Sequence, residues 1–374
     1  MEPSTPVPQP TALQPQQPST PVNQEPSQPS GLQLKKRNRK PLIIGIVIAA
    51  VVIVLGAASA FAYTMYQTPQ KVVTDAVISL FTAEKLTHKG TLSMTTPTDA
   101  GETTMNLAFD GNISQDGVVT NGTLKVSQAD KAAEVRVETI IGNDQAIYVK
   151  VNDVPTVITD YLTLFGGESV DAKQITETFS ETIAVINGKW VKIDLSQSDE
   201  FKEVGTAQKC YQDLAKKLEN DATLRNELKD AYTANQFISI NKELGLKTIN
   251  GTPSLGYEIG TDEAKTKAFF EDLNTSQLAT ELKKCDENID LSYDTVKSET
   301  EGTTTNQIWA SQFGHSLTRF ESTYQNDEQR GSLVFEPKIG DSTPVTIPTD
   351  SVSTDAVIEA FRRDTEMLQT QMLQ

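Results

Sequence analysis

The sequence predicts an α+β domain that a single transmembrane helix holds outside a membrane. Three patterns lead to this prediction: an unbroken apolar run over 42–63, alternation with period two over 91–151, and amphipathic stripes on both sides of that region. Period-two alternation is typical of strands with one buried face, and apolar residues at steps of three and four are typical of packed helices.

The apolar run over 42–63 predicts the membrane anchor. It contains no charged residue, and five cations lie just before it, within 35–40. About 20 apolar residues suffice to cross ~30 Å of hydrocarbon, and cationic flanks stay on the cytoplasmic side. We therefore expect a cytoplasmic tail over 1–40, a signal-anchor helix within 41–66 and an extracytoplasmic domain over 67–374.

A cleaved signal peptide is the alternative to an anchor. The small residues over 58–62 resemble a signal-peptidase site. Against cleavage, the apolar run is long and 40 residues precede it, far more than the usual charged leader. No cysteine follows the run closely enough for lipid attachment, so the sequence favours the uncleaved anchor.

Charge differs strongly between the two sides of the predicted anchor. Of 33 basic and 50 acidic residues, only five basic and two acidic ones lie before position 67. The remainder is strongly acidic and repels nucleic acid and anionic lipid head groups. The tail is rich in Pro and Gln and is expected to be disordered. Its P-x-x-P spacings leave open a cytoplasmic partner with an aromatic groove.

The chain has two cysteines, Cys210 and Cys285, both on the outer side of the anchor. Because that compartment is oxidising, we expect a disulfide between them, with two free thiols as the alternative. Closure of so long a loop can stabilise a fold by up to ~4 kcal/mol in the chain-entropy model.

In the first part of the outer domain a helix precedes a strand meander. The helix is expected from Pro69 onward, with an apolar stripe of Val73, Ala76, Val77, Leu80 and Phe81. The strands over 91–151 contain turn signals at Asp116-Gly117, Asn121-Gly122, Asp130-Lys131 and Gly142-Asn143-Asp144. Such strands predict an antiparallel sheet packed on one face.

The remaining elements alternate between helices and strands. Helices are expected over 153–165, 175–186, 199–235 and 354–373, and a further one after Thr261 as its cap. Strands are expected over 190–194, 237–249, 255–259, 289–296, 306–313, 316–324 and 331–337. We interpret the whole as one α+β domain with two strand-rich halves.

Four stretches give the chain a resemblance to a known group of proteins. They are NGKWVKID at 187–194, INGTPSLGYEI at 249–259, TDEAKTKAF at 261–269 and PVTIP at 344–348. In this order they resemble the LolA and LppX/LprG type of lipid- or lipoprotein-carrying envelope proteins. The resemblance implies a curved, half-barrel-like antiparallel sheet covered by helices around an apolar cavity. The predicted anchor and the helical insertion near 199–235 depart from that group.

Catalytic and metal-binding patterns are scarce. The two histidines, His88 and His315, are not near a Cys or acidic cluster with ligand spacing, and no nucleophile elbow, phosphate loop or zinc motif occurs. We therefore predict a binding protein without cofactor or metal, which shelters a lipid or an acylated protein. A non-catalytic surface interaction or sensor module is the alternative. The candidate cavity lining is Met105, Leu107, Phe109, Val135, Val137 and Trp190.

Overall fold

A computed structural model describes residues 66–98, 101–114, 116–144, 146–165, 171–195, 202–296 and 302–372. The chain divides into Met1–Ala60 and Phe61–Gln374, and every described residue belongs to the second unit. The predicted tail, the anchor run and the alternative cleavage site therefore lie outside the described residues. Within the described ranges, no helix is both long and apolar enough to cross a bilayer.

Twelve strands in the described part of the chain form one sheet in the order β12-β6-β5-β4-β3-β2-β1-β11-β10-β9-β8-β7. The first six are β1 (Leu86–Thr98), β2 (Gly101–Ser114), β3 (Gly117–Gln128), β4 (Lys131–Gly142), β5 (Ala146–Val151) and β6 (Trp190–Asp194). The others are β7 (Ile238–Ile249), β8 (Thr252–Thr261), β9 (Thr303–Ser311), β10 (Leu317–Gln325), β11 (Arg330–Ile339) and β12 (Ser351–Ser353).

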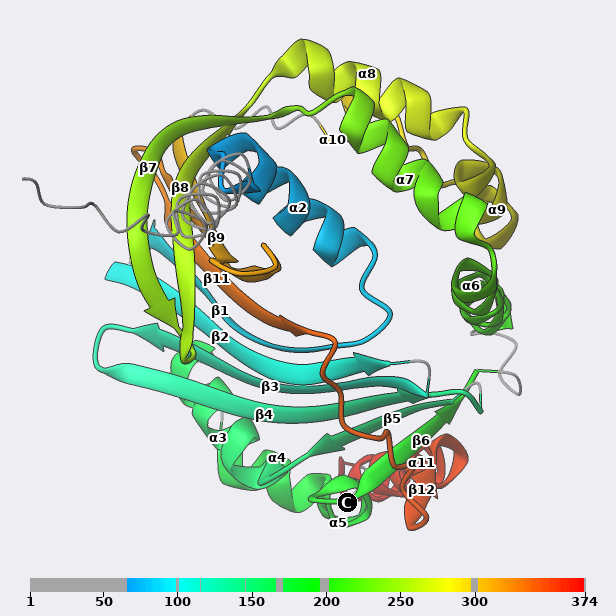
Figure 1. The fold of residues 1–374 in the computed structure, drawn as a ribbon. Coiled ribbons are helices and arrows are strands. Elements are labelled where there is room, and N and C mark those ends of the chain that lie inside the picture. Colours follow the sequence, from blue (N-terminus) through cyan, green and yellow to red (C-terminus); the bar gives the residue numbers. More distant parts are fainter. Residues whose placement is uncertain are drawn as a thin grey trace, which may run out of the picture. The chain divides into compact units, whose positions relative to one another are not determined.

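The two strand-rich halves are continuous, because β1 pairs with β11. This antiparallel register runs from Leu86 opposite Ile339 to Thr95 opposite Arg330. All neighbouring strands are antiparallel except β12 and β6, which are parallel. The sheet is strongly curved (Figure 1). The predicted α+β class with a curved antiparallel sheet is thereby confirmed.

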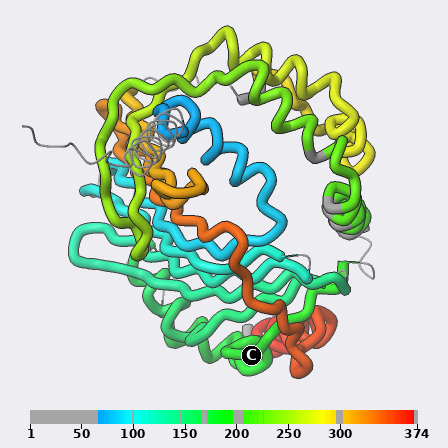
Figure 2. Tube along the Cα trace, viewed as in Figure 1, coloured from blue at the N-terminus to red at the C-terminus, as the bar shows by residue number. Residues whose placement is uncertain are grey.

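Helices lie on both sides of the sheet (Figures 1 and 2). On the concave side α2 (Pro69–Phe81) lies nearest the strands, with a layer formed by α6 (Lys202–Asn220), α7 (Ala222–Ala234), α8 (Glu263–Asn274), α9 (Gln277–Cys285) and the short α10 (Tyr293–Val296). On the convex side lie α3 (Val154–Phe165), α4 (Ala172–Thr178), α5 (Ser180–Ile186) and α11 (Thr354–Met372).

The main core fills the space between the concave face, α2 and the helical layer. The predicted stripe of α2 supplies the fully buried Val73 and Ala76 and the nearly buried Val77. Facing them are Tyr257 and Ile308 of the sheet, together with Tyr232, Leu224, Phe269 and Leu278 of the helical layer. The helix α2 is therefore stabilised because its apolar residues are covered by the sheet on one side and by the helical layer on the other.

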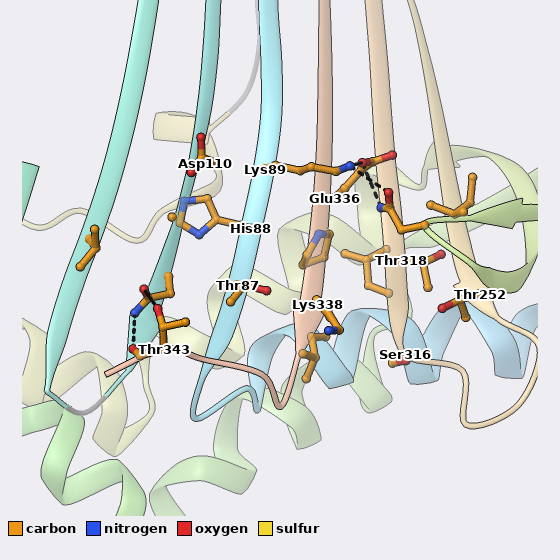
Figure 3. Close-up of a pocket in the computed structure, with 18 of the residues that line it drawn as sticks. Thr87, His88, Lys89, Asp110, Thr252, Ser316, Thr318, Glu336, Lys338 and Thr343 are labelled. Atoms are coloured by element: carbon orange, nitrogen blue, oxygen red, sulfur yellow. Dashed lines mark hydrogen bonds and ion pairs between the residues drawn. The ribbon is translucent and has the colours of Figure 1, made fainter. Parts of the chain in front are cut away.

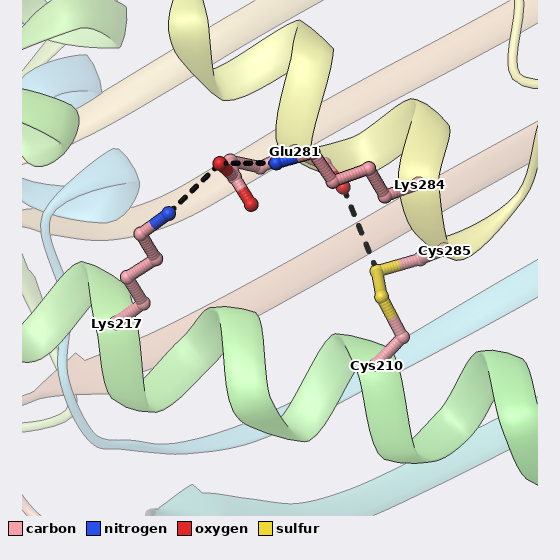
Figure 4. The surroundings of a disulfide bond; sticks show 5 residues. All are labelled: Cys210, Lys217, Glu281, Lys284 and Cys285. Atoms are coloured by element: carbon pink, nitrogen blue, oxygen red, sulfur yellow. Dashed lines mark hydrogen bonds and ion pairs between the residues drawn. A yellow bond between two sulfur atoms is a disulfide. The ribbon is translucent and has the colours of Figure 1, made fainter.

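The predicted disulfide is present and joins α6 to α9 (Figure 4). The Cα atoms of Cys210 and Cys285 are 5.2 Å apart across a sequence separation of 75. Next to the bridge, the Glu281 carboxylate accepts hydrogen bonds from Lys217 and Lys284, which lower the pKa of Glu281. Both covalent and polar contacts thus hold these helices together.

Several local features differ from what the sequence predicted. The helix α8 is capped by Asp262 rather than Thr261, because Thr261 is still paired with Ile238 in the sheet. Asn121-Gly122 lies inside β3, where Asn121 donates a hydrogen bond to Asp110 on β2.

The segment 289–296 forms no strand. The side chains of Asp286 and Asp290 accept hydrogen bonds from backbone N–H groups two residues ahead, which folds the chain into turns before α10. The helix α9 was not predicted, although the Ser276 hydroxyl caps it by accepting a hydrogen bond from the N–H of Ala279.

Candidate functional site

The two faces of the sheet differ in chemistry where β1 meets its neighbours. Along a strand, successive side chains point to opposite faces, and residues paired across strands share a face. Gly90 is paired with Phe109 and Phe335, on the concave face. Lys89 is paired with Asp110 and Glu336, on the convex face. The concave face is therefore apolar and the convex face is polar.

A cavity of about 650 Å³ lies on the concave face, between the carboxyl-terminal half of α2 and the strands. Its lining residues come from α2 and from seven strands: Val77, Leu80, Phe81, Leu86, His88, Phe109, Ile113, Ile238, Ile259, Ile308, Leu317, Phe320, Leu333 and Phe335. The volume falls within the range of ~300–1,000 Å³ that is typical of small-molecule pockets.

The chemistry of this wall is almost uniform. Thirteen of the fourteen lining residues are apolar, and His88 is the exception. Phe81 and Ile113 are 39% and 43% exposed, so they form a solvent-accessible rim. Half-exposed apolar side chains around a hollow indicate a binding surface more than a packed core.

Five of the six predicted lining residues share the cavity's face. Phe109 lines the cavity itself. Met105 and Leu107 precede it on β2 at steps of two. The register then places Val135 in line with Leu107 through Leu124, and Val137 in line with Phe109 through Gly122. All five are half-buried. They extend the apolar surface from the cavity across β2, β3 and β4.

Trp190 lies on the opposite face of the sheet from the other five. It is paired with Lys150, which is in turn bonded to Glu138, and the Lys150 ammonium lies 5.6 Å from the centre of the Trp190 ring. The indole packs in a small convex-side cluster with Ile140, Tyr148 and Ile347. Alternation in β6 puts Trp190 on the same face as Lys192 and Asp194, opposite Val191 and Ile193, so the pattern already indicated the polar face. The prediction that Trp190 lines the cavity is therefore wrong for this cavity.

The other walls of the cavity depend on long-range pairing. Leu80 and Phe81 were predicted only as a helical stripe, and Leu333 and Phe335 only as part of a strand. Leu80 and Phe81 meet Phe109 because α2 packs on the concave face. Leu333 and Phe335 meet it because β11 pairs with β1, some 250 residues earlier in the chain. Nothing local in the sequence specifies that pairing.

His88 is the one polar group in the cavity wall. Its ring centre lies 6.1 Å from that of Phe109 and 6.2 Å from that of Phe335. The Nδ1 atom is buried and has no hydrogen-bond partner in the structure. Burial lowers the pKa of His88, and the nearby Asp110 carboxylate only partly opposes this effect. The imidazole is therefore neutral near pH 7.

A second, polar hollow of about 580 Å³ includes many residues of the convex face (Figure 3). Its charged groups already have partners within the protein: Lys89 is paired with Glu336, Asp110 accepts a hydrogen bond from Asn121, and Lys338 is paired with Asp341. The Lys89 ammonium donates to Asn250 Oδ1 over 2.8 Å, and Asn250 Nδ2 donates to Glu336 Oε2 over 3.0 Å. Burial raises the pKa of Glu336, but hydrogen bonds from Asn250 and Lys89 outweigh it and hold the pKa below its usual value.

These pairs fasten parts of the fold rather than leave a site open. Asn250 lies at the tip of the β7–β8 hairpin, with φ at +48°, and the hairpin is thereby attached to β1 and β11. In the same hollow, Asn112 on β2 and Thr343 bond to each other twice, over 3.1 and 2.7 Å. The polar side chains of this hollow therefore hold parts of the fold together.

His315 forms another buried polar feature. It is fully buried, its Nδ1 lies 2.7 Å from Asp75 Oδ2 on α2, and the Tyr66 ring is stacked on it with centres 4.1 Å apart. Asp75 is also paired with Lys71 over 2.8 Å. Across the described ranges, no group of three or more His, Cys, Asp or Glu side chains could hold a metal ion.

Comparison with known proteins gives matches among solved structures. No protein-family model matches the chain, and no curated protein matches it. LprF from Mycobacterium bovis is 13% identical, with a TM-score of 0.32, over 76% of this chain and 97% of that one. The Mycobacterium tuberculosis lipoprotein LppX is 10% identical, with a TM-score of 0.29, over 74% and 97%. MucB is 8% identical, with a TM-score of 0.24, over 75% and 65%.

Proposed function

We propose that this protein binds the acyl chain of a lipid or of an acylated protein, in the cavity between α2 and the concave face of the sheet. The observation that carries the proposal is the cavity wall, in which thirteen of fourteen residues are apolar and none is charged. A charged ligand group there would lose its hydration without gaining a partner. A hydrocarbon chain gains free energy by leaving water for the same wall.

The half-buried residues beyond the cavity suit a long ligand. Met105, Leu107, Val135 and Val137 continue the apolar face away from Phe109. A chain longer than the cavity could lie along this surface, and its contact would shield these side chains from water. The proposed function is binding without catalysis, because Lys89 and Glu336 on the neighbouring polar face are held by Asn250, and His88 Nδ1 has no side-chain partner with which to form a catalytic pair.

The predicted anchor over 42–63 would keep this domain at the outer surface of a membrane. A holder or acceptor of acyl chains next to the bilayer fits that placement better than a free shuttle does. The alternative, a sensor module whose tail binds a cytoplasmic partner, stays a prediction from the sequence, because the tail lies outside the described residues.

Lipid retention by the full chain tests the proposal. The protein is extracted from expressing cells in polymer-bounded native nanodiscs, without detergent, and its lipids are identified by mass spectrometry. Two variants narrow the cavity: Ile113→Trp at the exposed rim and Leu333→Trp in the wall. The matched control is Thr323→Trp, on an exposed side chain of the convex face.

We expect the wild type and Thr323→Trp to retain an acylated species, at about one per chain, that both cavity variants lose. Surrounding bilayer lipids are the same in all samples and cancel. Ile113→Trp is the more informative variant, because its position is 43% exposed and a larger ring there displaces no core atom. Identical lipid profiles in all four samples would contradict the proposal.

A further inference from the structure

His88 is a polar residue at a position where the wall otherwise contains only hydrocarbon. On the same face its strand neighbours are Leu86 and Gly90, and its partners across the strands are Gly111 and Pro337. Two phenyl rings, of Phe109 and Phe335, lie about equally far from the imidazole. A leucine or methionine would fill this place without desolvating a polar group, so the imidazole costs stability unless it has a partner.

The protein does not supply that partner. The Nδ1 atom is buried without a hydrogen bond. A neutral imidazole has one N–H donor and one acceptor nitrogen, so at least one of these is unsatisfied here. Buried polar groups are nearly always hydrogen-bonded in folded proteins. The Nδ1 atom has almost no accessible surface, but the side chain as a whole is half-buried, and a turn of the ring about Cβ–Cγ would present this nitrogen to a group on the occupant of the cavity.

The rest of the wall limits what that group can be. A carboxylate or phosphate next to His88 would be repelled by the nearby Asp110 carboxylate and would meet no counter-ion on the cavity side, where the lining contains no Lys or Arg. An ammonium offers no acceptor to an imidazole N–H. A neutral acceptor meets no such penalty. An ester carbonyl is the neutral acceptor that occurs at the end of an acyl chain, and it accepts one hydrogen bond from an imidazole N–H.

We propose that His88 donates a hydrogen bond to the ester carbonyl of the bound acyl chain, so that the cavity selects acyl esters over hydrocarbons and over free fatty acids. This inference rests on the proposed function and adds the ligand class and the residue that recognises it. His88 then sets the depth at which the ester lies, and the chain extends along the apolar wall.

The test measures ligand preference in the full chain. The protein carries the photoreactive residue p-benzoylphenylalanine in place of Phe81, an aromatic side chain at the cavity rim that is 39% exposed, and is held in nanodiscs of diether phosphatidylcholine, which has no ester carbonyl. Methyl palmitate, octadecane and palmitate are added at equal concentration. After irradiation, mass spectrometry gives the ratio of their adducts in three backgrounds: His88, His88→Leu and His88→Asn.

We expect His88→Leu to lower the ratio of ester to hydrocarbon adducts by about threefold to tenfold, the range that one net hydrogen bond supplies. His88→Asn keeps a donor near the same place and should retain most of the preference. Differences in membrane partitioning and in photoreactivity cancel, because the same probes are compared between variants.

Three results would overturn this inference. The ratio could be unchanged in His88→Leu, or both adducts could fall together, in which case His88 is only wall. Palmitate could show the dependence on His88 instead of the ester, which would make the recognised group an anion. If no probe forms an adduct in any background, the proposed function itself fails, and that outcome is distinct from the other three patterns. Thermal unfolding of each variant shows that the fold is kept.

Discussion

The ring of Phe109 on β2 lies directly across the main chain of Gly90 on β1. A Cβ atom at Gly90 would lie 2.4 Å from Phe109 Cζ and 2.5 Å from the carbonyl oxygen of Val334. Glycine at this position therefore lets an aromatic ring cross the strand and form part of the cavity floor. The contact connects the backbone of one strand to the wall of the proposed binding site.

Gly90→Ala should destabilise the fold and move Phe109. The added methyl group cannot fit beside the backbone oxygen of Val334, so strand and ring must shift, at a cost of about 1–3 kcal/mol in unfolding free energy. Urea unfolding measures the change. The matched control is Gly331→Ala in β11, where a Cβ would meet its nearest atom at an ordinary 3.4 Å. Equal stability of the two variants would contradict the crossing of ring and strand.

Asp364 fastens the last helix to the convex side of the sheet. Its fully buried carboxylate accepts hydrogen bonds from the backbone N–H and hydroxyl of Thr182, over 2.8 and 2.7 Å, and from the N–H of Glu181. Burial raises the pKa of Asp364, but these hydrogen bonds outweigh it and leave the pKa below the usual value.

Asp364→Asn should lower the unfolding free energy by about 1–2 kcal/mol, as loss of a helix cap does. A depressed pKa stabilises the fold at pH values above the pKa of the unfolded chain, which is ~3.9 for Asp. The difference from wild type should thus be constant from pH 5 to pH 7 and shrink as the pH falls through the folded pKa. Asp355→Asn, on an exposed side chain of the same helix, should show a smaller effect. A difference that grows below pH 4 would contradict this assignment.

The disulfide should matter more for stability than for the cavity. Replacing both Cys210 and Cys285 by Ser should lower the unfolding free energy by about 2–5 kcal/mol, since the bridge closes a long loop. Denaturant unfolding with and without a reductant measures this. The reductant should change the wild type and leave the double variant unchanged. Alkylation of both thiols in the unreduced protein would show that the bridge is absent.

Asp75 is the only described hydrogen-bond partner of the buried His315 ring, whose Nε2 has none. Asp75→Ala should cost about 1–3 kcal/mol in unfolding free energy, because the remaining imidazole is buried without a partner. Lys71→Ala removes only the exposed partner of Asp75 and should cost less than about 1 kcal/mol. Similar costs for the two variants would show that the buried contact contributes little.

The sequence predicts which side chains share a face of the sheet better than it predicts which strands lie next to each other. Alternation places Met105, Leu107, Phe109, Val135 and Val137 on one face, and the register brings them into line. The same alternation puts Trp190 on the face of Lys192 and Asp194, so the period of β6 indicated the opposite face from the one expected for an aromatic lining residue. The order of the strands also cannot be predicted from residues that are close in the sequence. The pairing of β1 with β11, which brings Phe335 to the cavity, results from the folded chain as a whole.

The pairing of long strands can also override a local turn signal. The Asn-Gly pair at 121–122 is a strong turn signal, yet long flanking strands pair on both sides of it and keep β3 extended. His88 is visible in the sequence only as an isolated histidine. Its place between two phenyl rings, and its lack of a partner, follow from tertiary packing.

Photocrosslinking at one position on each face of the sheet tests the central claim most directly. Phe81 is an aromatic side chain at the cavity rim and is 39% exposed, so a benzoyl group extends a ring that is already there. Val334 points to the opposite face and is paired with Thr91. The full chain with p-benzoylphenylalanine at one or the other position is irradiated in intact expressing cells, and the modified peptide is identified by mass spectrometry. We expect acyl-lipid adducts at position 81 and none at 334. No lipid at position 81, or equal amounts at both positions, would contradict the proposed function.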